Sequence, residues 1–167
     1  MKVRLTLNGA PAALSCEPWE FLTEALRRHG LTGTKRGCET GDCGACSVLL
    51  DGEEVASCIL LAAQADGHAV TTVEGLGGFE RPHPIQEAFV DATAVQCGYC
   101  TPGMVIATKA LLERTPAPTE RDARECLAGH LCRCTGYVKP IKAILRAAAA
   151  CRPEGGTAGA PAPGGVA

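Results

Sequence analysis

A cysteine-rich loop constrains this chain more than any other feature. Residues 37–46 read GCETGDCGAC, and a fourth cysteine, Cys58, follows the third after eleven residues. Three glycines of the loop, Gly37, Gly41 and Gly44, stand where the backbone needs positive φ angles if its amides are to curl toward a central group. Three thiolates from one tight loop and a fourth from a distance indicate a metal centre.

The spacing C-x4-C-x2-C with a distant fourth cysteine is the one that plant-type [2Fe–2S] ligands have. The predicted ligands of a first cluster are Cys38, Cys43, Cys46 and Cys58. Tetrahedral zinc is the competing interpretation, but zinc sites usually combine two short cysteine or histidine pairs. A triplet with one distant partner fits zinc poorly, so the pattern favours iron–sulfur. A buried structural thiol explains one cysteine, but not four at this spacing.

The cysteine content also bears on compartment and stability. The chain has 167 residues, 11 cysteines and only six aromatic residues, so its core is thin and metal sites would help to stabilise it.

The start of the chain, MKVRLTLNG, reads as a strand and turn rather than a secretory signal. No apolar run approaches the ~18 residues of a membrane span. The net charge of −2, with interspersed signs, does not indicate nucleic acid or a membrane surface. We expect a soluble, cytoplasmic protein.

The N-terminal half is predicted to form a small mixed sheet crossed by one helix. Residues 3–7 alternate with period two, and Asn8-Gly9 is a strong hairpin signal. The further predicted elements are a return strand through 13–16, a helix from Pro18 to Gly30, a hairpin over 47–57, a short helix over 59–63 and a strand over 70–73.

After a glycine-rich linker the pattern changes to helices only. We predict four of them, one from Pro84, one over 102–112, one from Thr119 to Gly129 and one from Tyr137 to Cys151. Thr119 and Asp122 resemble a capping box at the third helix. The tail is Gly, Pro and Ala without periodicity, which is typical of disorder. The predicted division is a ferredoxin-like domain at 1–76, a linker at 77–83, a helical domain at 84–152 and a disordered tail at 153–167.

A second set of cysteines lies in the helical half, as Cys97 and Cys100 and, 31 residues further on, as Cys132 and Cys134. Helices that fold back would bring the two pairs together as four thiolates for a second [2Fe–2S] cluster. Each pair alone is weakly specific. CGYC could be a thioredoxin-type redox pair, but that motif belongs in a βαβ context. Zinc stays open, although C-x-C is an unusual half-site, and a Rieske site would need Cys-x-His, which does not occur in the sequence.

The remaining candidates carry less information. The four histidines show no ligand spacing, and we expect them on the surface or in the core; they are His29, His68, His83 and His130. Three cysteines are left outside the two sets, and for each the predicted role is a buried or semi-exposed structural thiol; they are Cys16, Cys126 and Cys151.

Together the two cysteine sets resemble one family closely. The chain is similar to the iron–sulfur subunit of the molybdenum hydroxylases, the group of xanthine dehydrogenase, aldehyde oxidoreductase, aerobic carbon monoxide dehydrogenase and 4-hydroxybenzoyl-CoA reductase. The matching motifs are GCETGDCGACSVLLDG (37–52), SC (57–58), QCGYCTPGM (96–104) and LCRCTGY (131–137). The resemblance extends from Met1 to about Cys151. His130 stands where family members commonly have Asn, a departure that touches a local capping contact and not a ligand.

The resemblance implies both a fold and a role. The fold is α+β, with a β-grasp, plant-type ferredoxin-like domain followed by an all-α four-helix domain that carries the second cluster. The role is electron transfer in an oxidoreductase complex, between a large molybdopterin-binding subunit and a medium FAD-binding subunit, in a heterotrimer that dimerises. This chain would hold two [2Fe–2S] clusters and have no substrate site and no catalytic residue of its own.

The resemblance also assigns positions. The helical cluster lies next to the molybdopterin, where Gln96 hydrogen-bonds the pterin and the Cys134 sulfur meets a pterin amine, and the other cluster lies nearer the FAD. For Gln96 the plainer interpretation is a cap of the cluster loop. Two other functions compete with the relay. A stand-alone ferredoxin would explain the first half only, and a zinc-stapled interaction module would explain both halves as scaffolding.

Overall fold

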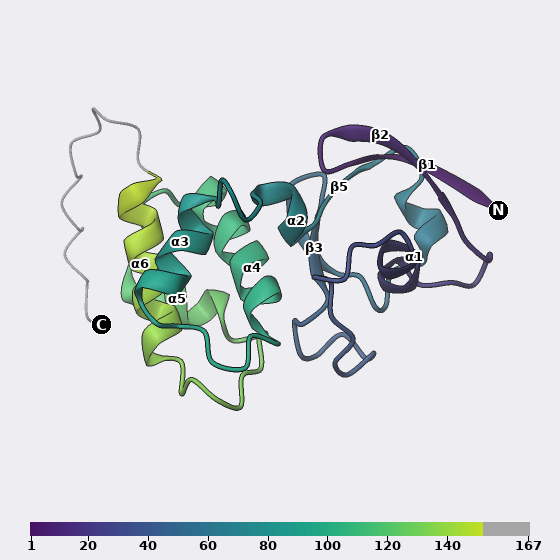
Figure 1. The fold of residues 1–167 in the computed structure, drawn as a ribbon. Helices are drawn as coiled ribbons and strands as arrows, with labels where there is room; N and C mark the ends of the chain where they lie inside the picture. Colours follow the sequence, from purple (N-terminus) through teal and green to yellow (C-terminus); the bar gives the residue numbers. More distant parts are fainter. Residues whose placement is uncertain (152–167) are drawn as a thin grey trace, which may run out of the picture.

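A computed structural model describes residues 1–151 of the protein, in which a five-stranded sheet and a group of helices lie side by side (Figure 1). The strands are β1 (Lys2–Leu7), β2 (Ala10–Ser15), β3 (Ser47–Leu50), β4 (Glu53–Ala56) and β5 (Ala69–Thr71). The helices are α1 (Leu22–Arg28), the 3-10 helix η1 (Ala62–Ala65), α2 (Val73–Leu76), α3 (Pro84–Asp91), α4 (Thr101–Arg114), α5 (Glu120–Cys126) and α6 (Val138–Ala150). The prediction of a mixed sheet plus helices is confirmed.

The sheet has the strand order β2-β1-β5-β3-β4. Alternate residues of β1 point into the core, where Val3, Leu5 and Leu7 are buried, as period-two patterning requires. Asn8 and Gly9 both have positive φ, 52° and 81°, which suits the tight turn between β1 and β2. β5 pairs parallel with β1 and antiparallel with β3. The central position of β5 therefore joins the two hairpins into one sheet.

The four longer helices of the C-terminal half, α3 to α6, enclose a second apolar core. Its largest fully buried members include Ile85, Phe89, Met104 and Ile144. The predicted capping box at α5 is confirmed, because the Thr119 side chain accepts a hydrogen bond from the Asp122 amide while the Asp122 carboxylate accepts one from the Thr119 amide. Between the halves, Leu49 of β3 packs against Ile106 and Ala110 of α4.

Several predicted boundaries differ from the structure. The first helix begins at Leu22 and not at Pro18, which lies in a turn. The helix predicted over 59–63 does not form as expected in the described chain, because Cys58 lies in a turn, residues 59–60 form bends, Leu61 is in a β-bridge, and η1 begins only at Ala62. A β-bridge between Phe21 and Leu61 accounts for both shifts, because it holds the two residues extended. Val73, predicted to end the last strand, instead opens α2.

Three further predictions concern membrane spans, the C-terminal tail and the linker. No helix within residues 1–151 is long and apolar enough to cross a lipid bilayer. The predicted tail at 153–167 lies outside the described residues. The segment at 77–83, predicted as a linker, contains bends and no regular element between α2 and α3. The structure thus sets the sheet and the helices against each other with the cysteine loops on both.

Candidate metal centres

The first four predicted ligands form the N-terminal site, defined as Cys38, Cys43, Cys46 and Cys58. Three of them lie on the loop between α1 and β3. Gly41 and Gly44 have positive φ as predicted, and so does Glu39, at 60°. Gly37 serves a different need from the one predicted, because a Cβ there would lie 2.5 Å from the Cys43 sulfur. The loop therefore combines left-handed turns with close backbone approach to a thiol.

The thiols of the N-terminal site approach one another in two pairs. The thiol of Cys38 lies close enough to Cys43, and that of Cys58 close enough to Cys46, for the neighbour to shift its pKa. Hydrogen bonds from Thr40 lower the pKa of Cys38 to about 6, since donors stabilise a thiolate. Burial raises the pKa of Cys58 to about 11. A cation at the site would have to offset this cost of ionising a buried thiol.

The other four predicted ligands form the C-terminal site, defined as Cys97, Cys100, Cys132 and Cys134. The first two lie between α3 and α4, and the last two between α5 and α6, so the helices bring distant pairs together as predicted. The sulfurs of Cys97 and Cys134 are 3.7 Å apart. The thiols of Cys100 and Cys132 lie close enough to shift each other's pKa. Each pair thus combines one cysteine from each loop.

Helix ends and hydroxyls tune the thiols of the C-terminal site. Cys100 directly precedes the first turn of α4, whose positive dipole end favours an anionic ligand, although burial raises the pKa of its free thiol to about 12. Burial also raises the pKa of Cys132, but hydrogen bonds to its sulfur from Thr135 N, at 3.4 Å, and Thr135 Oγ1, at 3.0 Å, outweigh that effect. The resulting pKa is about 7.

The donor sets fit two-iron clusters. A [2Fe–2S] cluster takes four thiolates, two on each iron, and both sites offer four thiols arranged as two pairs. A mononuclear zinc site would need its ligands around a single point. Within residues 1–151, no group of three or more His, Cys, Asp or Glu side chains is arranged to hold one metal ion. The four-cysteine sets and their spacing therefore suit [2Fe–2S] clusters.

The two sites differ in exposure. Cys46 and Cys58 are buried, whereas Cys97 and Cys134 are exposed at the surface of the helical half. Gln96, adjacent to Cys97, is also exposed, and its side chain makes no hydrogen bond with the described residues. The plainer interpretation of Gln96 as a cap of the cluster loop therefore finds no support within residues 1–151.

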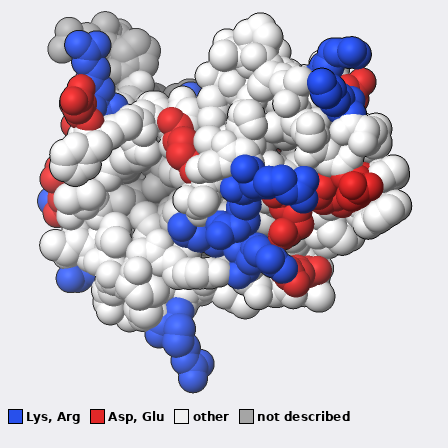
Figure 2. All heavy atoms as spheres, turned by 45° about the vertical axis from the view of Figure 1, so that its right-hand side comes forward, with Lys and Arg blue, Asp and Glu red and all other residues white. Residues whose placement is uncertain are grey.

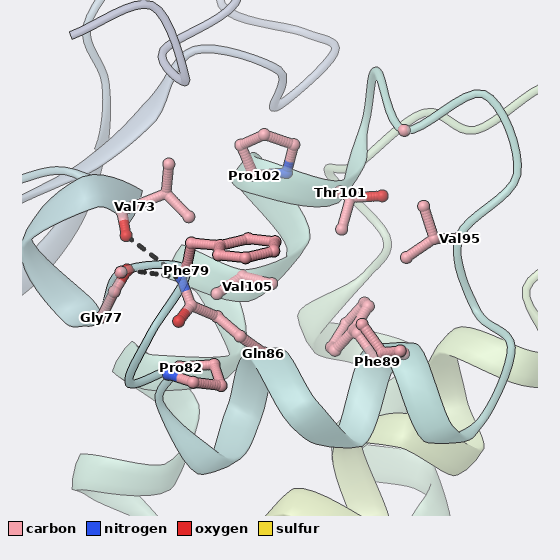
Figure 3. Close-up of a pocket in the computed structure, with 13 residues that line it drawn as sticks. Val73, Gly77, Phe79, Pro82, Gln86, Phe89, Val95, Thr101, Pro102 and Val105 are labelled. Atoms are coloured by element: carbon pink, nitrogen blue, oxygen red, sulfur yellow. Dashed lines mark hydrogen bonds between the residues drawn. The ribbon is translucent and has the colours of Figure 1, made fainter.

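An apolar groove of about 460 Å³ lies beside the C-terminal site (Figure 3). Val95 and Gly98 line it and flank the exposed pair Gln96 and Cys97 in the sequence. The other lining side chains come mainly from the loop after α2 and from α3 and α4; they include Phe79, Pro82, Phe89, Val90, Pro102 and Val105. Phe79 is fully exposed, at 104%, and Val90 is 67% exposed.

Gln86 holds one wall of the groove in place. Its amide nitrogen donates to the carbonyl oxygens of Val73 and Gly77, both at 3.3 Å (Figure 3). Its amide oxygen accepts from the His83 amide at 2.8 Å. Hydrogen bonds therefore connect the loop that carries Phe79 to α3, and they fix the backbone that forms this wall of the groove.

Hydrogen bonds between the two ligand loops are features that the sequence did not reveal. The Leu131 amide donates to the carbonyl oxygen of Cys43, at 3.0 Å. The Tyr99 hydroxyl donates to the carbonyl oxygen of Arg36. Each bond joins the N-terminal and C-terminal ligand loops directly. Tyr99, Leu131 and Cys43 all lie inside the cysteine motifs, but the spacing within those motifs carries no information about these partners.

The cysteines outside the two sites and the histidines differ in burial. Cys16 is buried and Cys126 is half-buried, as predicted, and burial raises the pKa of Cys126 to about 12. Cys151 is exposed at the end of α6, so the expectation of a buried or semi-exposed thiol is wrong there. Of the four histidines, His130 is buried while His29 and His68 are exposed.

Charged side chains of both signs gather over the N-terminal half. Figure 2 shows basic and acidic side chains next to one another toward the right, with a mostly uncharged surface toward the left. Arg36 pairs with Glu24 at 3.1 Å and with Glu39 at 2.6 Å. Exposed pairs of this kind contribute little to stability. The mixed signs agree with the expectation that no strong charge field marks this chain.

Comparison with known proteins gives matches over nearly the whole described chain. A family model described as a 2Fe-2S iron-sulfur cluster binding domain matches residues 5–72, and one described as a [2Fe-2S] binding domain matches residues 72–145. The nicotinate dehydrogenase small FeS subunit of Eubacterium barkeri is 44% identical over 150 residues, which is 89% of this chain and 96% of that protein. The xanthine dehydrogenase iron-sulfur-binding subunit of Escherichia coli O157:H7 is 43% identical, over 86% and 91% of the two chains.

Solved structures agree. A chain of quinoline 2-oxidoreductase from Pseudomonas putida 86 superposes with a TM-score of 0.86 at 45% identity, over 90% of this chain and 94% of that chain. Aldehyde oxidoreductase from Desulfovibrio gigas gives a TM-score of 0.85 at 41% identity, over 89% of this chain but only 17% of that chain. The same unit thus occurs both as a separate small subunit and as part of a much longer polypeptide.

Proposed function

The chain belongs to the family of small iron–sulfur subunits of molybdenum hydroxylases, and on that premise we propose that it relays electrons between a molybdopterin-binding subunit and an FAD-binding subunit. It is a subunit of an oxidoreductase. We assign substrate chemistry to the partners. When bound, the two [2Fe–2S] clusters supply one-electron redox chemistry, so that a two-electron oxidation can be passed on in single steps.

The observation that carries the proposal is the 3.0 Å hydrogen bond from the Leu131 amide to the Cys43 carbonyl. Cys43 is a proposed ligand of the first cluster, and Leu131 directly precedes Cys132, a proposed ligand of the second. Only peptide backbone and one hydrogen bond therefore separate the two ligand sets. A chain that holds two redox sites in such direct connection is built to conduct between them.

The exposure of the ligands supports an orientation for the relay. We assign the C-terminal site to the molybdopterin side, because Cys97 and Cys134 are exposed there and a short gap to the donor favours transfer. Gln96 would contact the pterin, and the Cys134 sulfur would meet a pterin amine. We assign the N-terminal site to the FAD side.

We further propose that the groove receives an apolar segment of the molybdopterin-binding subunit. The groove is continuous with the exposed edge of the C-terminal site through Val95 and Gly98. A fully exposed Phe79 at a well-formed apolar groove is a typical anchor of protein–protein interfaces. A partner that covers the groove would at the same time close the solvent-exposed edge of the cluster.

The finer architecture belongs to the same proposal. We propose a β-grasp, ferredoxin-like domain over 1–76, a linker over 77–83 and a four-helix cluster domain from 84 to 152. We also propose a heterotrimer with the two larger subunits, which dimerises. The expected cytoplasmic location stays a prediction.

The test of the relay is the composition of the native complex. We expect about four irons and four sulfides per chain, and co-purification with one larger chain that binds molybdopterin and one that binds FAD. Stoichiometric zinc without acid-labile sulfide would contradict the proposal. A monomeric chain without partners in native extracts would favour the stand-alone ferredoxin instead.

The test of the groove is a charge placed within it. Val90→Asp should weaken binding of the molybdopterin-binding subunit by about tenfold or more, because an ionised carboxylate would have to be buried at the interface. The matched control is Trp19→Asp, because Trp19 is 73% exposed on the N-terminal half, away from the groove. Equal binding by Val90→Asp and the unsubstituted chain, measured by co-purification under matched conditions, would argue against the groove.

A further inference from the structure

His130 is a buried imidazole at the junction of the two halves. It lies between α5 and the ligand Cys132, and it is only 4% exposed. Its Nε2 is 3.0 Å from the Glu54 carboxylate and 3.3 Å from the Ser47 hydroxyl. Both partners belong to the sheet, on β4 and β3. A side chain of the helical half thus ends inside the N-terminal half.

The surrounding backbone is shaped to admit this ring. A Cβ on Gly44 would come within 2.6 Å of both the His130 ring and the Gly129 carbonyl oxygen. A Cβ on Gly103, at the start of α4, would overlap the Gly44 carbonyl oxygen. Gly44 belongs to the loop that carries Cys43 and Cys46. The imidazole is therefore packed directly against the ligand loop of the N-terminal site.

The backbone of His130 is connected to the C-terminal site in turn. Its carbonyl oxygen accepts a hydrogen bond from the Tyr137 hydroxyl at 3.0 Å, and that hydroxyl accepts from the Cys132 amide at 2.8 Å. Tyr137 sits in a left-handed conformation, with φ of 67°, at the start of α6. A continuous chain of contacts therefore runs from Glu54 through His130 and Tyr137 to the ligand Cys132.

We infer that His130 is a positioning residue for electron transfer, which anchors the C-terminal ligand loop in the sheet and so fixes the placement of the two clusters relative to each other. The inference rests on the proposed function. His130 contacts no cluster sulfur in this assignment. It acts through Leu131, whose amide bonds to Cys43, and through Cys132, whose amide bonds to Tyr137.

The hydrogen-bonding pattern explains why the anchor is strong. Nδ1 of His130 is buried and has no partner among the described residues, and a buried unpaired N–H costs about 1–3 kcal/mol. The ring is therefore best accommodated with its proton on Nε2, donating to Glu54. Burial raises the pKa of Glu54, but hydrogen bonds from His130 and Ser47 outweigh the effect of burial, so the pKa lies below its usual range. The acceptor stays ionised.

The experiment compares three variants in the loaded complex. His130→Leu keeps an apolar side chain of fair size but removes the donor, whereas His130→Gln keeps an N–H near the position of Nε2. His68→Leu is the matched control, because His68 is an exposed histidine of the same sheet region that pairs with Asp51 at 2.5 Å. The readouts are the rate of transfer between the clusters, the magnetic splitting between the two reduced clusters, and hydrogen exchange of the Leu131 and Cys132 amides.

We expect His130→Leu to retain iron and partners, to exchange both amides faster, to change the splitting and to slow transfer between the clusters, because the rate of electron tunnelling falls steeply as the distance between two centres grows. His130→Gln should restore most of each readout, and His68→Leu should alter none. Unchanged exchange, splitting and rate in a fully loaded His130→Leu complex would overturn the inference.

A second variant keeps the inference testable if His130→Leu loses its clusters. Tyr137→Phe retains the ring and removes only the hydroxyl that links His130 to Cys132. The same changes of exchange and rate are expected, and their absence would overturn the inference. A failure of the proposed function would already appear in the unsubstituted chain, as missing iron or missing partner subunits, and so is distinguishable.

Discussion

The N-terminal and C-terminal sites offer the same donors in opposite settings. The N-terminal site is built mostly by one loop, and two of its cysteines, Cys46 and Cys58, are only 2% and 4% exposed. The C-terminal site is assembled from two loops that α4 and α5 separate in the sequence, and two of its cysteines are exposed. Residues that are close in the sequence can form an enclosed site, whereas an exposed site can be covered by the surface of another subunit. The open site is therefore the one that we assign to a partner surface.

Despite this difference, the two sites share one local feature, a threonine that donates a hydrogen bond to a cysteine sulfur. In each, a threonine amide donates to the sulfur of a cysteine two or three residues earlier, Thr40 to Cys38 and Thr135 to Cys132, both at 3.4 Å. These two thiols have pKa values lowered to about 6 and about 7. The similarity indicates that hydrogen bonds from a threonine hydroxyl and amide to sulfur, and not burial, make the thiolates ready to bind metal.

The largest expected effect comes from removing one ligand at each site. Cys58→Ser should lose half of the iron and lower the free energy of unfolding by more than about 4 kcal/mol, because loss of a metal site in a small core is among the most damaging changes. Cys134→Ser should also lose half of the iron but cost clearly less stability, because Cys134 is exposed. Iron and sulfide assays measure the cluster content, and denaturant unfolding measures the stability of each variant. Equal destabilisation by the two substitutions would contradict the proposed difference between the sites.

An intermediate effect is expected where the two halves touch. Gly103→Ala should destabilise the chain by about 1–3 kcal/mol, because its Cβ would overlap the Gly44 carbonyl oxygen and overpacking costs this much. That outcome opposes helix propensity, which favours Ala over Gly by ~1 kcal/mol. The matched control is Gly129→Ala, where a Cβ meets nothing within 4 Å and stability should hold or rise. Thermal unfolding of the loaded chain checks both.

The smallest expected effect concerns Gln96. Gln96→Ala leaves every thiol in place, so the iron content and both cluster EPR signals should stay normal. Reduction of the C-terminal cluster by substrate should slow, or molybdenum retention should fall, because a polar contact to the pterin is lost. The control is Gln64→Ala, which removes only a cap of Leu61 by the Gln64 side chain. Unchanged turnover and full molybdenum occupancy in Gln96→Ala would assign the residue no role at the cofactor.

Local patterns in the sequence predicted much of the fold. Alternation in β1, the Asn8-Gly9 turn and the Thr119 capping box all act between near neighbours, and such short-range preferences can be recognised without a structure. The errors occurred where a distant residue intervened. The bridge between Phe21 and Leu61 shortened one predicted helix and displaced another. The residues next to Phe21 and Leu61 in the sequence do not predict that the two will pair.

The same division applies to the sites. Cysteine spacing by itself predicts the two sets of proposed ligands, because a cluster requires thiolates and a loop of fixed length can present only certain ones. Spacing could not determine which thiols pair across loops, which sulfurs face solvent, or that Leu131 bonds to Cys43. Those features depend on how α4 packs against the sheet through Ile106 and Leu49. Packing between distant segments is a property of the assembled chain, so only the tertiary structure decided how the two redox sites are joined.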